Sequence, residues 1–183
     1  MAKGSSYERD LSKKLSLWIS DGEDDSWCWR TASSGGRATI RAKTNRKTSG
    51  AAGDIRATDP RAEWFFKLFS VEAKKGYASA TIDSMIDSKQ KVPMIVQFWE
   101  QACGSCNISD SLYPVVILAK DNRKELAIFD SSFVFTLTRL FGKLSFPHFK
   151  YRSEEYYLCI CTLKDLLAFM DVKTLREEVE SAA

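Results

Sequence analysis

The chain has 183 residues, of which 44% are hydrophobic and 12% are aromatic, and its formal net charge is +3. This length suits one α/β domain with a complete core, and the hydrophobic content excludes an intrinsically disordered chain. No apolar run reaches the roughly 18 residues that a bilayer-spanning helix needs, and the N-terminus MAKGSSYERD lacks the apolar segment of a secretory signal. We therefore expect a single domain over residues 1–183, without a membrane partner and with a cytoplasmic location.

The first part of the chain predicts one amphipathic helix followed by three strands. The helix has an apolar stripe formed by Leu11, Leu15 and Trp18. In chain order these elements are expected at 6–20 for the helix and at 27–32, 53–58 and 64–75 for the strands. The run 64–75, WFFKLFSVEAKK, is apolar over enough residues to form a buried central strand. A turn signal at 58–60 predicts that the last two strands form a hairpin.

The second part of the chain predicts a helix, a hairpin and a further strand before a helical C-terminus. Pro93 suits the first turn of a helix that runs to about Cys103. Thr162 and Asp165 form a capping arrangement ahead of an apolar helix, and an acidic helical tail follows. The other expected segments are a short helix or irregular crossover at 79–90, strands at 113–120 and 125–130 around a turn at 121–124, and a late strand at 155–161.

Three charged residues occupy positions that favour phosphodiester chemistry. Asp54 opens one predicted strand, and Glu72 and Lys74 end the next one. Side chains two residues apart in a strand share a face, so Glu72 and Lys74 point the same way, and a hairpin would bring Asp54 beside them. Two carboxylates and an ammonium can hold a hard divalent cation and orient a water molecule. The alternative is an exposed hairpin with a charged end, but these charges end a core strand, where unpaired charge is costly.

Charge is distributed unevenly just before Asp54. Residues 26–53 contain no acid, and their Ser- and Gly-rich composition is typical of a loop. A basic loop next to a metal-binding acid suits contact with a nucleic-acid backbone, whereas the alternative is a solvated loop that aids solubility. The predicted DNA-binding residues of this segment are Arg30, Arg37, Arg41, Lys43, Arg46 and Lys47.

The pattern Asp54 and Glu72-Ala73-Lys74 resembles the PD-(D/E)XK nuclease superfamily, with Gly53 at the position of the family's leading Pro. The predicted element order over about residues 6–130 is similar to the core order of that superfamily. Within it, the small Holliday-junction-resolvase-like branch is most similar. The further matching positions are Glu8 in the first helix, Gln97 and Trp99 in the helix after the ExK strand, and Lys120 in PVVILAKDNR.

The resemblance implies a restriction-endonuclease-like α/β core, with a mixed central sheet flanked by helices, and a C-terminal strand and helices over about 131–183. It implies a Mg²⁺ (or Mn²⁺) ion bound by Asp54, Glu72 and the backbone carbonyl of Ala73. Lys74 would stabilise or help to deprotonate the attacking water. DNA, branched or duplex, is the implied substrate, and links to recombination and repair follow from the branch.

Three of the site residues have plain structural alternatives. Glu8 lies on the face of the apolar stripe and is expected to be catalytic or a second-metal ligand, but Ser5 and Glu8 also fit a capping box. Gln97 is expected to face the substrate, but it lies off the apolar stripe of its helix and could be merely exposed. Lys120 is expected to contact a phosphate, but it could equally be a solubilising charge at a strand end.

The function predicted from these features is a metal-dependent, structure-selective DNA endonuclease that acts as a homodimer. The apolar segment 133–141 could supply the dimer interface or pack in the core. The alternatives are a nonspecific or exonucleolytic DNase of the same superfamily and a catalytically inactive DNA-binding protein on the same scaffold.

Two cysteine pairs could in principle form a zinc site. The pairs are Cys103 with Cys106 and Cys159 with Cys161, and they lie far apart in the sequence. Because free cysteines are ordinary core residues in a reducing compartment, we expect core packing rather than zinc binding.

Overall fold

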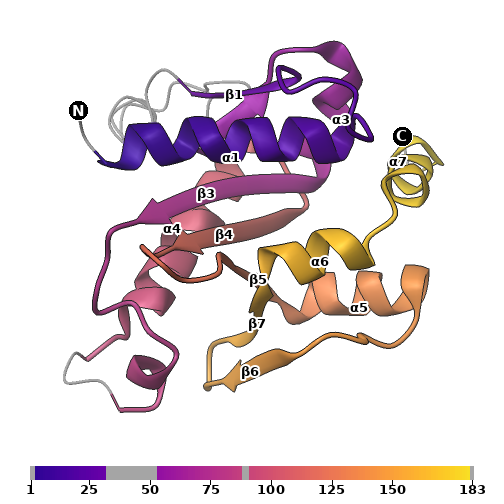
Figure 1. The fold of residues 1–183 in the computed structure, drawn as a ribbon. Coiled ribbons are helices and arrows are strands. Elements are labelled where there is room, and N and C mark those ends of the chain that lie inside the picture. Colours follow the sequence, from indigo (N-terminus) through magenta and orange to yellow (C-terminus); the bar gives the residue numbers. More distant parts are fainter. Residues whose placement is uncertain (1–2, 32–52, 88–90, 182–183) are drawn as a thin grey trace.

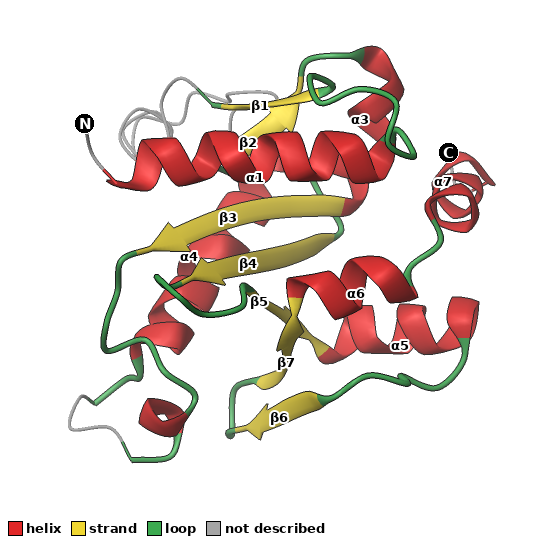
Figure 2. Cartoon of the chain, in the orientation of Figure 1, coloured by secondary structure: helices red, strands yellow, loops and turns green. Residues whose placement is uncertain are grey.

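The computed structural model describes residues 3–31, 53–87 and 91–181, which form an α/β fold around a five-stranded sheet (Figures 1 and 2). The strand order is β3-β4-β5-β7-β6, in which β3 and β4 are parallel and the other neighbours are antiparallel. The sheet is therefore mixed, as expected. Its strands are β3 (Phe69–Lys75), β4 (Tyr113–Ala119), β5 (Leu126–Asp130), β6 (His148–Arg152) and β7 (Tyr157–Thr162).

Helices cover both faces of this sheet. Alternate residues of β4 show why, because Val115 and Ile117 belong to one buried cluster, whereas Val116 and Leu118 belong to another. The first cluster packs under α1 (Lys3–Ile19), α5 (Ser131–Phe141) and α6 (Leu163–Phe169), and the second packs under α4 (Met94–Ser109). The remaining helices are α3 (Glu63–Leu68), α7 (Val172–Ser181) and the short 3₁₀ helices η1 (Pro60–Ala62) and η2 (Asp83–Met85).

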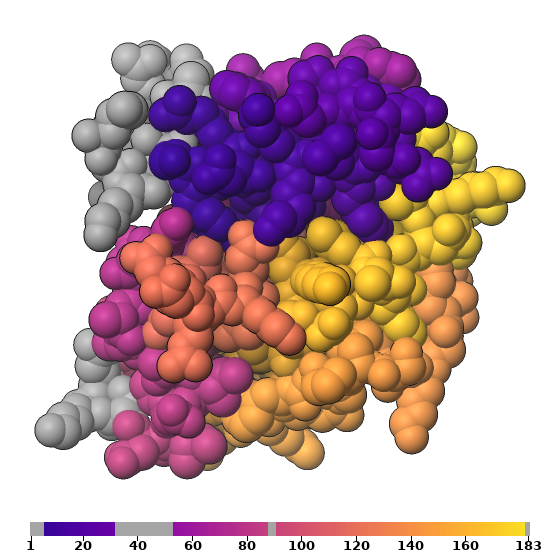
Figure 3. All heavy atoms as spheres, in the orientation of Figure 1, coloured from indigo at the N-terminus to yellow at the C-terminus, as the bar shows by residue number. Residues whose placement is uncertain are grey.

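The two ends of the described chain pack against each other. Figure 3 shows the atoms of α1 (indigo) lying against the C-terminal segment (yellow), and the Trp18 indole donates a hydrogen bond to the Leu167 carbonyl at 2.9 Å. Within the described residues, no helix combines the length and the apolar content that a membrane span requires.

The expected strand at 64–75 is half wrong. Its first part is the helix α3, in which Trp64, Phe65 and Leu68 are buried at helical spacing, and only Phe69–Lys75 forms a strand. The turn signal before it is a helix start, because the Asp59 side chain accepts from the Arg61 N–H and Pro60 follows at the first helical position.

The predicted hairpin between the second and third strands is also wrong. The strand β2 (Ile55–Ala57) pairs with β1 (Cys28–Arg30) in a separate two-stranded sheet, and η1 and α3 intervene before β3. The helix α4 continues to Ser109, beyond the expected end, and stops where Asp110 adopts a left-handed conformation. Strand β6 is not among the predicted elements.

The other expected elements are confirmed. The helix at the N-terminus, the β4–β5 hairpin around 121–124 and the late strand β7 all form. The Thr162 hydroxyl accepts from the Asp165 N–H at 3.1 Å, so the capping arrangement before α6 is present. The segment 133–141 lies in α5, where Phe133 and Leu137 are buried and Phe135 is 71% exposed.

Candidate active site

Asp54 lies at the open edge of β3, opposite the edge that pairs with β4. Its backbone N–H donates to the Val71 carbonyl at 2.9 Å, and its Oδ2 accepts from the Ala73 N–H at 2.8 Å. The N–H and C=O of one strand residue point to the same side of the strand, so the Ala73 carbonyl is directed to the same edge as the Asp54 carboxylate. One backbone and one side-chain hydrogen bond thus fix Asp54 beside β3, although β2 does not pair with β3 as a strand.

Gly53 allows Asp54 to approach β3 this closely. Its φ is +85°, in the region that favours glycine, and a Cβ atom here would lie 3.1 Å from the Val71 carbonyl oxygen. The Gly53 carbonyl accepts a hydrogen bond from the Thr31 hydroxyl at 3.0 Å, and the Thr31 N–H donates to the Asp54 carbonyl at 2.9 Å. Glycine at this position therefore has a local steric reason.

Replacement of Gly53 by Ala is expected to lower the free energy of unfolding by about 2–4 kcal/mol, because it combines left-handed strain with a clash against β3. The matched control is Gly76→Ala, since Gly76 has a φ of +89° but no atom within 4 Å of a built Cβ. Denaturant unfolding of both variants measures the free energy that each one loses. The difference between the two losses gives the cost of the clash between residue 53 and β3. Equal losses in the two variants would contradict a steric role for Gly53.

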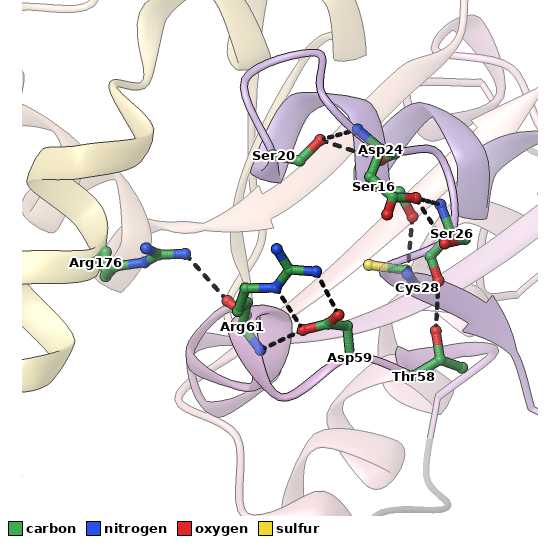
Figure 4. Close-up of polar contacts among 9 residues, drawn as sticks. All are labelled: Ser16, Ser20, Asp24, Ser26, Cys28, Thr58, Asp59, Arg61 and Arg176. Carbon is green, nitrogen blue, oxygen red and sulfur yellow. Dashed lines mark hydrogen bonds and ion pairs between the residues drawn. The ribbon is translucent and has the colours of Figure 1, made fainter.

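The support for β1 and β2 comes from α1 and from the turn after β2 (Figure 4). The Ser16 hydroxyl on α1 accepts from the Cys28 N–H at 2.8 Å, and the Thr58 hydroxyl donates to the Ser26 carbonyl at 2.6 Å. The Arg61 guanidinium binds both carboxylate oxygens of Asp59, at 2.9 and 2.7 Å. The two-stranded sheet that carries Asp54 into place is thus anchored at several points.

Glu72 and Lys74 lie on the α4 face of β3, as their alternation predicts. Both are buried, at 3% and 8% exposure, and the Lys74 Nζ donates to the Glu72 Oε1 at 2.7 Å. Lys74 also donates to the Gln101 Oε1 at 2.9 Å, and the Gln101 amide donates to Glu72 in turn. The Ser105 hydroxyl donates to the Glu72 Oε2 at 3.4 Å. The helix α4 therefore holds both charged groups through two polar side chains.

Gln101, one helical turn after Gln97, contacts both Glu72 and Lys74, whereas the expectation that Gln97 faces the substrate stays a prediction. The Gln97 side chain is exposed and its amide donates to the Val92 carbonyl at 2.9 Å, near the start of α4. Gln97, Gln101 and Ser105 occupy one face of α4 at a spacing of four residues. The spacing of four residues identifies three side chains that could contact Glu72 from α4. The sequence alone does not tell which turn of the helix lies next to Glu72.

Glu8 reaches the same region from α1. It is buried, its carboxylate lies 3.8 Å from Arg30 of β1, and its negative charge helps to raise the pKa of Asp54. Ser5 is already inside α1, which includes Lys3, so Glu8 is not the third residue of a helix capped by Ser5. The position beside Asp54 and Arg30 keeps Glu8 and Arg30 as candidate site residues.

The electrostatics of the site centre on Asp54. Burial raises the pKa of this carboxyl to about 7, and the charge of Glu72 adds to the effect. The Ala73 N–H and the Lys74 ammonium act in the opposite direction but do not cancel it. Two buried carboxylates and a single buried ammonium therefore leave the site short of positive charge.

A divalent cation fits this donor set. Mg²⁺ prefers oxygen ligands, usually one or two carboxylates with water and substrate oxygens completing the coordination. The Asp54 carboxylate and the Ala73 carbonyl offer such oxygens at the open edge of β3, and the Glu72 carboxylate offers others on the α4 face of the same strand. Among residues 3–31, 53–87 and 91–181, no group of three or more His, Cys, Asp or Glu side chains is arranged to hold a metal ion, so a cation here would rely on the carbonyl and on water.

The remaining predicted site residues lie elsewhere or outside the described chain. Lys120 directly follows the last residue of β4, and its Nζ donates to the Ala78 carbonyl at 2.8 Å. The basic residues of the loop that fall outside the described residues are Arg37, Arg41, Lys43, Arg46 and Lys47.

The four cysteines do not form one cluster. Cys159 and Cys161 are buried on the α1 face of the sheet, whereas Cys103 packs on the α4 face, next to Cys106 on the same helix. Burial raises the pKa of Cys106 and of Cys159 to about 11, which keeps both thiols protonated at neutral pH. The expected core packing is consistent with this arrangement.

Comparison with known proteins gives one match. A family model described as "Phage putative PDDEXK endonuclease" matches residues 1–177. No curated protein and no solved structure matches the chain. The family match spans α1 through most of α7 and includes every residue of the candidate active site.

Proposed function

The chain belongs to the family of phage PDDEXK endonucleases, and from this premise we propose that it hydrolyses DNA phosphodiester bonds at Asp54, Glu72 and Lys74. The match confirms the PD-(D/E)XK superfamily and the restriction-endonuclease-like α/β fold that the sequence predicts. One observation carries the proposal: Asp54, Glu72 and Lys74 are all buried, and the charges of Glu72 and Lys74 act on the Asp54 carboxyl, which is bonded to the open edge of β3. Such a cluster is costly to bury and serves no packing purpose.

PDDEXK nucleases generally use divalent metals, and we propose that Asp54, Glu72 and the Ala73 carbonyl hold Mg²⁺ or Mn²⁺ here. The raised pKa of Asp54 supports this, because a site short of positive charge gains most from a cation. When bound, the ion would supply Lewis-acid stabilisation of the phosphate and lower the pKa of a bound water.

The chain's own groups would orient the reactants. The Lys74 ammonium, with three N–H donors of which two contact Glu72 and Gln101, has one left for a phosphate oxygen or the attacking water. The Gln101 amide holds Lys74 and Glu72 in register, and the Phe98 ring lies 5.4 Å from the Lys74 Nζ and limits its movement. Burial in this low-dielectric setting strengthens each of these interactions.

Gln101→Ala is expected to slow cleavage by about 10- to 100-fold, because Lys74 and Glu72 lose the side chain that links them. Gln97→Ala on the same helix face is the matched control and is expected to change the rate by less than about 3-fold. Single-turnover cleavage at saturating Mg²⁺ measures both, and a titration of Mg²⁺ separates weaker cation binding from slower chemistry. A larger loss for Gln97→Ala would contradict the role proposed for Gln101 and favour Gln97 as the glutamine that acts on the substrate.

Structure selectivity is the finer part of the proposal. The positions Glu8, Asp54, Glu72, Lys74 and Gln97 resemble the Holliday-junction-resolvase-like branch, which favours branched DNA and a homodimer with two active sites. In this chain Phe133 and Leu137 of α5 are committed to the core, so an interface through α5 would have to use its exposed face around Phe135.

The experiment that tests the proposal is incubation with a four-way junction, a duplex of equal length and a single strand, each with Mg²⁺, with Mn²⁺ and with EDTA. Cleavage with either metal and none with EDTA is the expected result. Preferential cutting of the junction by a dimer, with its mass determined by light scattering, supports the selective form. Cutting of all substrates by a monomer supports a nonspecific nuclease, and binding without cutting under every condition favours an inactive DNA-binding protein.

A further inference from the structure

A hollow of about 450 Å³ lies on the α1 face of the sheet, beyond the C-terminal end of β3. Four elements contribute to its wall: α1, the end of β3, the β4–β5 turn and the start of α6. Figure 3 shows the atoms of α1 (indigo), the β4–β5 turn (coral) and α6 (yellow) meeting on the face turned toward the viewer. Its basic side chains are Lys14, Lys75, Lys120, Arg123, Lys124 and Lys164.

Positive charge exceeds negative charge around this hollow. Against six basic side chains, only Asp10 and Glu125 contribute carboxylates to the wall. Glu125 is paired with Lys14, and Lys75 lies 3.5 Å from the exposed Asp121 carboxylate. Across the described part of the chain, no carboxylate lies within ion-pair distance of the other four cations, Lys120, Arg123, Lys124 and Lys164.

Like charges are crowded together at the β4–β5 turn. The Arg123 N–H donates to the Lys120 carbonyl at 3.2 Å, which folds the turn back on itself. Partial burial lowers the pKa of Lys120, and the neighbouring Arg123 guanidinium lowers it further. An anion between these groups would relieve that repulsion.

The hollow and the candidate active site are adjacent. Lys75 follows Lys74 directly, and because strand side chains alternate, Lys75 points to the α1 face, with its Nζ 5.7 Å from the Tyr7 ring centroid. On α1, Tyr7 lines the hollow and the next residue, Glu8, belongs to the candidate active site. The two sites therefore share the end of β3 and the first turns of α1, and a polyanion leaving one would pass the other.

We propose that this hollow is a second phosphate-binding site, which takes backbone phosphates of the DNA strand that flanks the cleaved bond. The inference rests on the proposed function, because that function makes DNA the ligand. A row of cations from separate elements, mostly without carboxylate partners, suits a backbone that presents regularly spaced charges rather than a single small anion. Contacts of this kind position the substrate and carry no sequence information.

The test is the double variant Arg123→Ala/Lys164→Ala, which removes two cations from different elements, neither with a carboxylate partner in the described structure. Lys143→Ala/Lys150→Ala is the matched control, because it removes the same charge near β6, at the opposite edge of the sheet. Affinity for a short labelled duplex is measured in EDTA over a series of NaCl concentrations. We expect the pocket variant to bind about tenfold more weakly, with a log–log salt slope smaller by about 0.9 for each lost contact, whereas the control changes little.

Each outcome decides the proposal. Equal losses in the two variants would overturn it, since net charge alone would then explain the binding. If inorganic phosphate competes with the duplex equally well in wild type and in the pocket variant, the hollow is not a site for free phosphate. If wild type binds phosphate strongly in the hollow but the pocket variant keeps its affinity for DNA, the DNA assignment is overturned. Binding is measured in EDTA, which prevents catalysis, so this test does not depend on cleavage. A protein that binds DNA through this hollow in EDTA but does not cut DNA with Mg²⁺ or Mn²⁺ would refute the nuclease function and leave the phosphate site standing.

Discussion

Glu72→Gln is expected to reduce DNA cleavage by about 1,000-fold or more, because it deletes one of the two carboxylates while keeping the side-chain shape. A glutamine at this position can still accept a hydrogen bond from Lys74 through its Oε1, so the local packing is expected to persist. DNA binding in EDTA, followed by fluorescence anisotropy, is expected to stay near the wild-type value. Single-turnover cleavage with Mg²⁺ measures the loss.

The control for this variant is Glu154→Gln, in the exposed turn between β6 and β7, which removes the same charge far from β3. Circular dichroism and thermal melting of both variants set a temperature at which each is folded, because Lys74 in the variant remains buried without its ionic partner. Normal cleavage by folded Glu72→Gln would place the chemistry elsewhere in the chain.

The path of the chain to the candidate site differs from the path that the sequence predicts. The charges of Glu72 and Lys74 act on the Asp54 carboxyl, yet the hairpin expected to bring these residues together is absent. Asp54 reaches β3 through its own hydrogen bonds to Val71 and Ala73, after β2 has paired with β1 instead. A residue pattern can thus indicate that groups meet while leaving open the path of the chain between them.

The missed helix α3 has a physical explanation. Aromatic residues favour strands in general, but Trp64, Phe65 and Leu68 have a spacing that buries one side of a helix. Asp59 and Pro60 begin the short helix η1, which leads directly into α3. A short apolar run of this kind does not distinguish a buried strand from a buried helix. Tertiary packing against Trp18 and Phe69 decides the outcome, since both rings contact Phe65.

The contacts of Gln101 with Glu72 and Lys74 were not predicted, because they depend on a different kind of information. Both residues have the same type, face and helix, and only the axial position of α4 relative to β3 separates them. That position follows from how the buried side chains Phe98 and Ala102 pack on the sheet, which no local pattern encodes. Sequence reasoning could name the helix face but not the turn.

The second large effect concerns stability. Asp54→Asn is expected to raise the free energy of unfolding by about 1–3 kcal/mol in EDTA above pH 7, although it removes a residue of the proposed active site. The Asp54 carboxyl has its pKa raised from 3.8 to about 7 by burial and by Glu72, so its ionised form is disfavoured in the folded protein. Asparagine cannot ionise, and its side-chain oxygen can still accept from the Ala73 N–H.

The pH dependence follows from the direction of that shift. Between about pH 4 and 7 the unfolded chain has already lost the Asp54 proton while the folded chain retains it, so the wild-type free energy of unfolding falls as the pH rises through this window. Above it the penalty is constant, and below it the two proteins are expected to have similar stability. Chemical denaturation of wild type and Asp54→Asn at several pH values measures the difference.

Mg²⁺ is expected to reverse the order. A cation that binds only the folded wild-type protein stabilises it in proportion to the logarithm of its concentration, whereas Asp54→Asn has lost a charged ligand and gains little. Wild type and Asp54→Asn therefore measure two quantities: the electrostatic cost of the buried carboxylate in EDTA, and the stabilisation by cation binding in Mg²⁺. If Asp54→Asn were less stable than wild type in EDTA at pH 8, the carboxylate would be a structural cap for the β3 edge, and the metal site would have to be sought among other residues.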